Sequence, residues 1–220
     1  MPAFFNRREF SSALLAAGAG ASLLRAGAAS AQGAAPVEGR DYTLVTPPQP
    51  VATPGKFEVI EFFSYACPHC SAFEPTLQAW AKTLPPDVVL RRVPVPFLYN
   101  AQNLQPAYYA LETTGLVDKI QMKIFSAIHV DKQRLDKPED IAEIVAKNGG
   151  DAAKFLAAFK SFSVATSVSR AKKLTADYKV DAVPGLAVQG RYLTSPSQAG
   201  SSPQALAVVD ALIQRARKGG

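Results

Sequence analysis

The chain contains two cysteines, and they lie three residues apart in the tetrapeptide Cys67-Pro68-His69-Cys70. A strand-like apolar run at residues 59–65 leads into the pair, and a segment with helical character at residues 71–82 follows it. A strand that feeds a Cys-x-x-Cys at the start of a helix is typical of thiol–disulfide redox sites. We therefore interpret Cys67 and Cys70 as a redox-active pair.

Two other interpretations of the pair are weaker. A structural disulfide here would close a loop of only four residues, which restricts the unfolded chain little compared with a long-range bridge. A zinc site usually needs four ligands, and beyond the two cysteines the sequence offers only His69, inside the loop, and the distant His129. We expect no metal site, and we interpret His129 as structural or exposed.

The first 31 residues have the pattern of an export signal. A charged start precedes a moderately apolar run at residues 13–24, and Ala29-Ser30-Ala31 fits a cleavage site. We expect a signal peptide at residues 1–31 and a periplasmic location. That location matters because disulfides persist outside the reducing cytosol.

The paired arginines suggest the export route. Arg7 and Arg8 are followed by the bulky Phe10, which resembles a twin-arginine signal. The low hydrophobicity of the Ala/Gly-rich run also favours this route over general secretion. A retained membrane anchor is the remaining alternative, although the run is short and glycine-rich for a membrane span.

Composition and charge narrow the class of protein. The 220 residues suit one domain, or one domain with a sizeable insertion, and 48% hydrophobic residues provide enough material for a buried core. The formal net charge is +6, but the Lys and Arg residues are scattered along the chain. We expect no nucleic-acid partner, because phosphate binding needs clustered cations.

Hydrophobic periodicity predicts the order of the elements. It indicates strands at residues 42–45, 57–64 and 88–93, with a helix at 68–83 between the last two. The period then becomes 3.6 and predicts five helices, at residues 104–113, 116–130, 138–148, 151–161 and 163–178. Strands at 186–189 and 191–193, a loop at 194–200 and a helix at 203–217 complete the chain. We divide it into a domain formed by residues 40–100 and 179–217 and an inserted helical domain at residues 101–178.

This order looks like an α/β protein with a thioredoxin fold and an inserted helical domain. The stretch from Glu61 to Cys70, together with Val183-Pro184 ahead of the final hairpin, closely resembles the DsbA family of exported disulfide oxidases over residues 40–217. The resemblance implies dithiol oxidation of secreted polypeptides and reoxidation by the membrane protein DsbB. We expect a monomer with no cofactor other than the Cys67–Cys70 disulfide.

The physics of a helix start predicts unequal cysteines. At the N-cap, the Cys67 sulfur faces unpaired N–H groups and the positive end of the helix dipole, and Pro68 fits the first helical position. A protonated His69 adds to this field. We expect Cys67 to be the low-pKa sulfur that substrates attack, and Cys70 to be its buried partner. A stabilised thiolate favours the reduced form and makes the pair a disulfide donor.

Val183 and Pro184 form the second half of the predicted site. The resemblance implies that their peptide bond is cis and that Pro184 packs beside the cysteines. We expect it there to hold a substrate strand against the Val183 backbone and to keep metal ions from the thiols. An ordinary trans proline in a turn is the alternative.

Four charged residues lie near the pair or in the adjoining strands. Glu61 interrupts an apolar strand, and the resemblance implies a buried acid beneath the disulfide that accepts a proton from Cys70 or modulates its pKa. An edge or exposed position is the alternative. Glu74 resembles a second acid of that cluster, but a solvated helix charge is the interpretation we prefer. Arg91 or Arg92 would pair with either acid in such a cluster, but we interpret both as surface charges.

Three alternatives to a disulfide oxidase remain. A periplasmic reductase or an isomerase of the same superfamily would share the Cys-x-x-Cys spacing. A non-catalytic chaperone would use the groove beside Pro184 to hold unfolded chains. The intact cysteine pair weighs against the chaperone, because binding alone does not need two thiols.

Overall fold

The structure is a computed structural model that describes residues 35–219, and its centre is a five-stranded mixed sheet. The strand order is β1-β5-β4-β2-β3, in which β2 and β3 are parallel and the other neighbouring pairs are antiparallel. The strands are β1 (Thr43–Leu44), β2 (Phe57–Phe63), β3 (Val88–Pro94), β4 (Gly185–Val188) and β5 (Tyr192–Thr194).

Strand β2 lies between β3 and β4, and six of its seven residues are buried. The run of apolar residues that predicts it is what a strand covered on both faces requires. Glu58 and Glu61 interrupt this run and are nevertheless buried. Their burial needs compensating partners, which the neighbouring strand β3 supplies.

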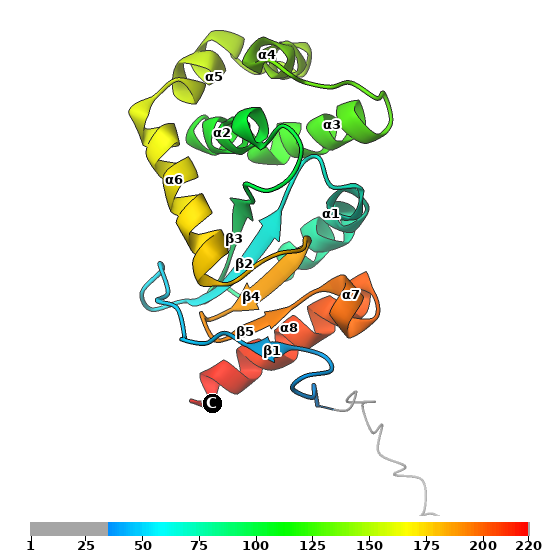
Figure 1. Cartoon of the computed structure of the whole chain (residues 1–220), viewed down its shortest axis with the longest axis vertical. Helices are drawn as coiled ribbons and strands as arrows, with labels where there is room; N and C mark the ends of the chain where they lie inside the picture. The colour runs from blue at the N-terminus through cyan, green and yellow to red at the C-terminus, as the bar shows by residue number, and fades with distance from the viewer. Residues whose placement is uncertain (1–34, 220) are drawn as a thin grey trace, which may run out of the picture. The chain divides into compact units, whose positions relative to one another are not determined.

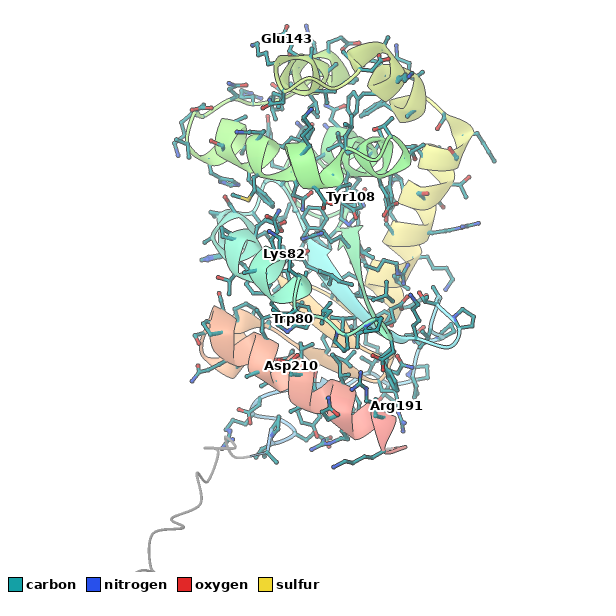
Figure 2. The ribbon with its side chains drawn as sticks, turned by 180° about the vertical axis from the view of Figure 1, so that it is seen from behind. Trp80, Lys82, Tyr108, Glu143, Arg191 and Asp210 are labelled. Carbon is teal, nitrogen blue, oxygen red and sulfur yellow. The ribbon has the colours of Figure 1, made fainter. Side chains whose placement is uncertain are left out.

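Helices cover both faces of the sheet. Figures 1 and 2, drawn from opposite sides, show α1 (Pro68–Ala81) and α8 (Ser202–Arg217) on one face and α6 (Phe162–Asp177) on the other. Trp80 of α1 packs in the core between α1 and α8, and its indole N–H donates to Asp210 of α8 at 3.0 Å. Burying an aromatic side chain of this kind contributes roughly 2 kcal/mol.

Five helices follow one another between β3 and β4, as the change of period predicts. They are α2 (Ala101–Thr113), α3 (Val117–His129), α4 (Pro138–Lys147), α5 (Ala152–Phe159) and α6. Figure 1 shows α2 and α3 beyond the ends of β2 and β3, with α4 and α5 packed on them. Fully buried side chains of these helices, such as Phe125 and Phe155, share one core with Phe62 and Phe63 of β2.

The sequence analysis does not predict one short helix, and some predicted helix and strand ends differ from the observed ones by a few residues. The predicted loop at residues 194–200 contains a short helix, α7 (Pro196–Ala199), capped by Ser195. Four residues are too few to give a periodic signal, although Pro at the first helical position after a Ser cap is a usual helix start.

The predicted signal peptide at residues 1–31 lies outside the described residues. Among residues 35–219, no helix has the length and apolar character that crossing a membrane requires.

Gly190 offers a test of the tight turn between β4 and β5. Its φ is +67°, and a Cβ at this position would lie 1.9 Å from the carbonyl oxygen of Gln49. We expect Gly190→Ala to lower the free energy of unfolding by at least about 3 kcal/mol, because the clash with backbone adds to the cost of a left-handed φ. Denaturant-induced unfolding measures this.

The matched control is Gly55→Ala. Gly55 has a similar φ of +77°, but a Cβ there meets no atom within 4 Å. We expect this variant to lose only about 1 kcal/mol, the cost of the backbone conformation. Equal losses in the two variants would contradict the close approach of Gln49 to the turn.

Candidate active site

The two cysteines lie at the start of α1, where the sequence places them. Cys67 is the N-cap in an extended conformation, and Pro68 occupies the first helical turn. The backbone N–H of Cys70 donates to the Cys67 sulfur at 3.4 Å. Both residues are free thiols in this structure. The helix start therefore directs a backbone donor at one sulfur only.

The surroundings of Cys67 stabilise its thiolate. Its pKa is lowered to about 6, first by a hydrogen bond from the Cys70 thiol, then by the backbone N–H groups of Cys70 and His69 and by the charge of His69. Partial burial opposes the shift. A thiol with this pKa is about nine-tenths ionised at pH 7, whereas an ordinary cysteine is only a few per cent ionised.

Cys70 has the opposite environment. It is fully buried, and its pKa is raised by burial, by its hydrogen bond to Cys67 and by the negative charge of that neighbour. Glu61 also raises the pKa of Cys70, which places the acid within electrostatic reach of this sulfur. The pair therefore consists of one sulfur that ionises readily and one that holds its proton.

The Val183–Pro184 peptide bond is cis, as the resemblance implies. The Cys67 thiol donates to the carbonyl of Val183 at 3.4 Å, so this loop lies directly against the reactive sulfur. A cavity of about 360 Å³ opens beside it and is lined by His69, Ala72, Val183, Pro184 and several serines of the β5–α8 region. A pocket of this size beside the Val183–Pro184 loop accommodates a side chain of a bound polypeptide.

Beneath the helix, a buried guanidinium joins two buried carboxylates. Arg92 of β3 donates from Nε to Glu61 at 3.0 Å and from Nη2 to Glu74 at 2.9 Å. Both acids are fully buried, and the Arg92 side chain is 13% exposed. Gln78 also donates to Glu74 at 2.8 Å. Burial raises the pKa of both carboxyl groups, while Arg92 opposes the shift.

Two interpretations from the sequence are wrong here. Glu74 is not a solvated helix charge, because α1 turns it inward onto Arg92. Arg92 is not a surface charge, because it lies opposite Glu61 in the parallel pairing of β2 and β3. Arg91 is partly exposed, but it too binds a buried acid, Glu58, at 3.2 Å. Arg91 and Arg92 lie in the middle of the strand predicted at residues 88–93. Two adjacent charges inside a strand are the sequence signal that could have indicated these ion pairs.

Sequence reasoning also missed a link from the site to α3. The hydroxyl of Tyr65 donates to the side-chain oxygen of Gln121 at 2.6 Å, and Gln121 also lies beside Glu74. His129 of α3 donates from Nε2 to the carbonyl of Tyr65 at 2.8 Å, which is a structural role as expected. No local pattern identifies Gln121, because its partners come from distant parts of the chain.

The charged groups of this region do not form a metal centre. Among residues 35–219, no group of three or more His, Cys, Asp or Glu side chains is placed to hold a metal ion. The buried acids instead have Arg92 and Arg91 as their cationic partners. This arrangement supports thiol–disulfide chemistry, because the pKa is lowered for one sulfur and raised for the other, which lies near a buried acid.

Comparison with known proteins identifies the relatives of this chain. Residues 92–207 match the profile of the DSBA-like thioredoxin domain. The chain is 46% identical over 210 residues to the thiol:disulfide interchange protein DsbA of Bordetella pertussis, covering 95% of this chain and 98% of that protein. It is 42% identical over 193 residues to the DsbA of Burkholderia cepacia, covering 87% and 91%.

Solved structures agree with this relationship. The crystal structure of Pseudomonas aeruginosa DsbA superimposes with a TM-score of 0.79 at 37% identity, covering 82% of this chain and 94% of that one. The structure of NmDsbA1 from Neisseria meningitidis gives a TM-score of 0.75 at 29% identity, covering 83% and 95%. The α/β thioredoxin fold with its helical insertion is confirmed.

Alkylation of the reduced protein tests the inequality of the sulfurs. We expect iodoacetamide to modify Cys67 alone near neutral pH, with a rate that rises around a midpoint of about pH 6. Cys70→Ala removes the thiol that contributes most to this shift and should raise the midpoint. Cys70→Ser keeps a donor at the same place and should raise it less. A wild-type midpoint near 8.5 would contradict the assignment.

The buried Glu61 predicts a pH-dependent stability. Its pKa is raised to about 8 in the folded protein, so its contribution is fully present below pH 4.5 and is lost as pH rises through 8. Glu61→Gln keeps an acceptor for Arg92 but cannot ionise. We expect this variant to be more stable than wild type at pH 8, and the difference to shrink towards pH 5.

Thermal unfolding of the disulfide form measures this effect, because the cysteines do not titrate in that form. Glu139→Gln, at an exposed position of α4, is the control and should change little at any pH. A Glu61→Gln variant that is less stable than wild type throughout this range would show that Glu61 is ionised at neutral pH and held there by Arg92.

Proposed function

Because this chain belongs to the DsbA family of thiol:disulfide interchange proteins, and is thus a thiol–disulfide oxidoreductase, we propose that it acts in the periplasm as a dithiol oxidase. In this role it donates the Cys67–Cys70 disulfide to exported polypeptides that carry free thiols. The observation that carries the proposal is the unequal pair of sulfurs at the start of α1.

The first chemical step is attack of a substrate thiolate on the Cys67 sulfur. A substrate–Cys67 bond forms, the Cys67–Cys70 bond breaks, and the electron pair of that bond goes to Cys70. Cys70 then takes up a proton, because burial raises its pKa. Glu61 lies within electrostatic reach, and its carboxyl group also has a raised pKa. We assign to Glu61 the exchange of this proton with Cys70. We assign to Glu74 the tuning of the Glu61 pKa through their shared partner Arg92.

The second step releases the product. A second substrate thiolate attacks the substrate sulfur of the mixed disulfide, the substrate disulfide forms, and Cys67 leaves with the electron pair. The low pKa of Cys67 makes it the better leaving group and leaves it as a thiolate. The Cys70 thiol, the helix N–H groups and His69 stabilise that anion. The substrate has lost two electrons, and the enzyme is the dithiol.

The loop at Val183 and Pro184 orients the substrate. In the thiol form, the Cys67 S–H group donates a hydrogen bond to the Val183 carbonyl oxygen. The disulfide has no such hydrogen, so in the oxidised enzyme this carbonyl is free to accept from a backbone N–H of the substrate. The substrate cysteine is thereby presented to Cys67, and Pro184, with no N–H of its own, lies against the pair and keeps metal ions from the thiols.

The catalytic cycle needs an oxidant, and we assign this role to a DsbB-like membrane quinone reductase that returns the dithiol to the disulfide. The protein works as a monomer and needs no cofactor other than its disulfide. Export by the signal at residues 1–31 delivers it to the compartment where such substrates fold.

Redox equilibration with a series of glutathione buffers tests the proposed direction of electron flow. We expect a reduction potential well above the value of about −270 mV that is usual for reducing thioredoxins. We also expect the dithiol form to melt at a higher temperature than the disulfide form, because the stabilised thiolate belongs to the folded protein. A potential near that of thioredoxin would assign the protein to the reductases. A more stable disulfide form would indicate a structural bridge.

A further inference from the structure

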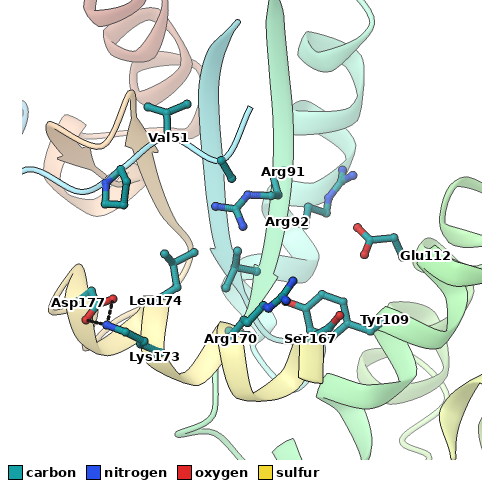
Figure 3. Close-up of a pocket in the computed structure, with 14 residues that line it drawn as sticks. Val51, Arg91, Arg92, Tyr109, Glu112, Ser167, Arg170, Lys173, Leu174 and Asp177 are labelled. Carbon is teal, nitrogen blue, oxygen red and sulfur yellow. Dashed lines mark hydrogen bonds and ion pairs between the residues drawn. The ribbon is translucent and has the colours of Figure 1, made fainter. Parts of the chain in front are cut away.

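A second cavity lies on the face of the sheet that α6 covers. It has a volume of about 420 Å³, and its walls come from α6, β3, α2 and the segment at residues 50–52 (Figure 3). Neither cysteine lines it, nor does Val183 or Pro184. Its volume lies within the range of sites that bind small molecules.

The cavity has an apolar wall. Val51, Val93, Ala171 and Leu174 line it and come from three separate segments of the chain. Figure 3 shows Val51 and Leu174 on the same side of the cavity, away from the polar residues of α2. A ligand with an aromatic or branched body would bury apolar area against these side chains.

Most of the cations that line the cavity already have partners. Arg91 binds Glu58 at 3.2 Å, and Arg92 binds Glu61 and Glu74. Lys173 binds Asp177 at 2.8 Å, which Figure 3 shows as dashed lines. Arg170 differs from them, because within the described part of the chain it has no ion pair or hydrogen bond. Its guanidinium is therefore the group available to a ligand.

Two hydroxyl groups accompany this guanidinium. Ser167 precedes Arg170 by three residues on α6, so both side chains lie on one face of the helix. Figure 3 shows both beside Tyr109 of α2. Neither hydroxyl has a hydrogen-bond partner among residues 35–219. A guanidinium and two hydroxyls that converge on one cavity are donors for a carboxylate.

Glu112 limits the charge of the ligand. It lines the α2 side of the cavity, and its side chain accepts a hydrogen bond from Tyr108 at 3.4 Å rather than pairing with a cation. A second negative charge on the ligand would meet this carboxylate without a free cation to offset it. A monoanion suits the site better than a phosphate or a dicarboxylate.

We propose that this cavity binds a small organic monocarboxylate with an aromatic or branched apolar body. The carboxylate binds Arg170, with hydrogen bonds from Ser167 and Tyr109. The apolar body lies on Val93, Ala171 and Leu174. The site is separate from the cysteine pair and is independent of the direction of electron flow there.

Titration of the methyl-labelled protein with 3-phenylpropanoate tests this assignment by NMR. We expect methyl shifts at Val93, Ala171 and Leu174, with a dissociation constant on the order of 1 mM for a ligand of this size. Two further probes separate charge from shape. The alcohol 3-phenylpropanol has the same ring without the charge, and acetate has the charge without the ring. Both should bind at least about tenfold more weakly.

Arg170→Gln should weaken 3-phenylpropanoate binding about tenfold or more and leave the reduction potential of the cysteine pair unchanged. Lys172→Gln, an equal loss of charge on the same helix but outside the cavity, should bind like wild type. Equal binding of acid and alcohol, or equal losses in the two variants, would overturn the proposal. Shifts confined to residues around Pro184 would also overturn it.

Discussion

The guanidinium of Arg92 is the interaction on which the active-site region depends. It joins the edge strand β3, the neighbouring strand β2 and the helix α1 through Glu61 and Glu74. Three ionised groups would leave a net charge of −1 in a buried place, which is costly. The raised pKa values of both acids indicate that the cluster relieves this cost by holding a proton. Glu61 Oε1 and Glu74 Oε2, which have no hydrogen-bond partner in the described structure, are the positions for it.

This cluster and the start of α1 act on different sulfurs. The helix start supplies donors to Cys67, whereas Glu61 of the cluster acts on Cys70. Burial is the main reason that Cys70 does not ionise, and its hydrogen bond to Cys67 and the acid beneath it add to this effect, so the proton that the pair retains stays on the inner sulfur. The outer sulfur is then the anion. The fold thereby makes two chemically identical residues unequal by setting one at the cap of a helix and the other over an acid.

The sequence predicts those parts of the site that depend on local structure. Cys67 and Cys70 are three residues apart at a helix start, so their geometry follows from the helix itself. The sequence does not predict the burial of Arg92 and Glu74, because that burial depends on the register of two parallel strands and on the docking of α1. Gln121 lies 56 residues from its partner Tyr65, and nothing in the local pattern around it indicates that contact.

The position of the helical insertion explains why it affects the site at all. It leaves the sheet after β3 and returns before β4, the two strands that flank β2. Its helix α3 therefore packs beside α1, where His129 holds the backbone of Tyr65 two residues before Cys67. Tyr65 in turn binds Gln121, which lies beside Glu74. A displacement of α3 would disturb both the backbone that leads into the cysteine pair and the acid beneath it. The insertion is thus a structural support for the redox pair and not only a cover for the end of the sheet.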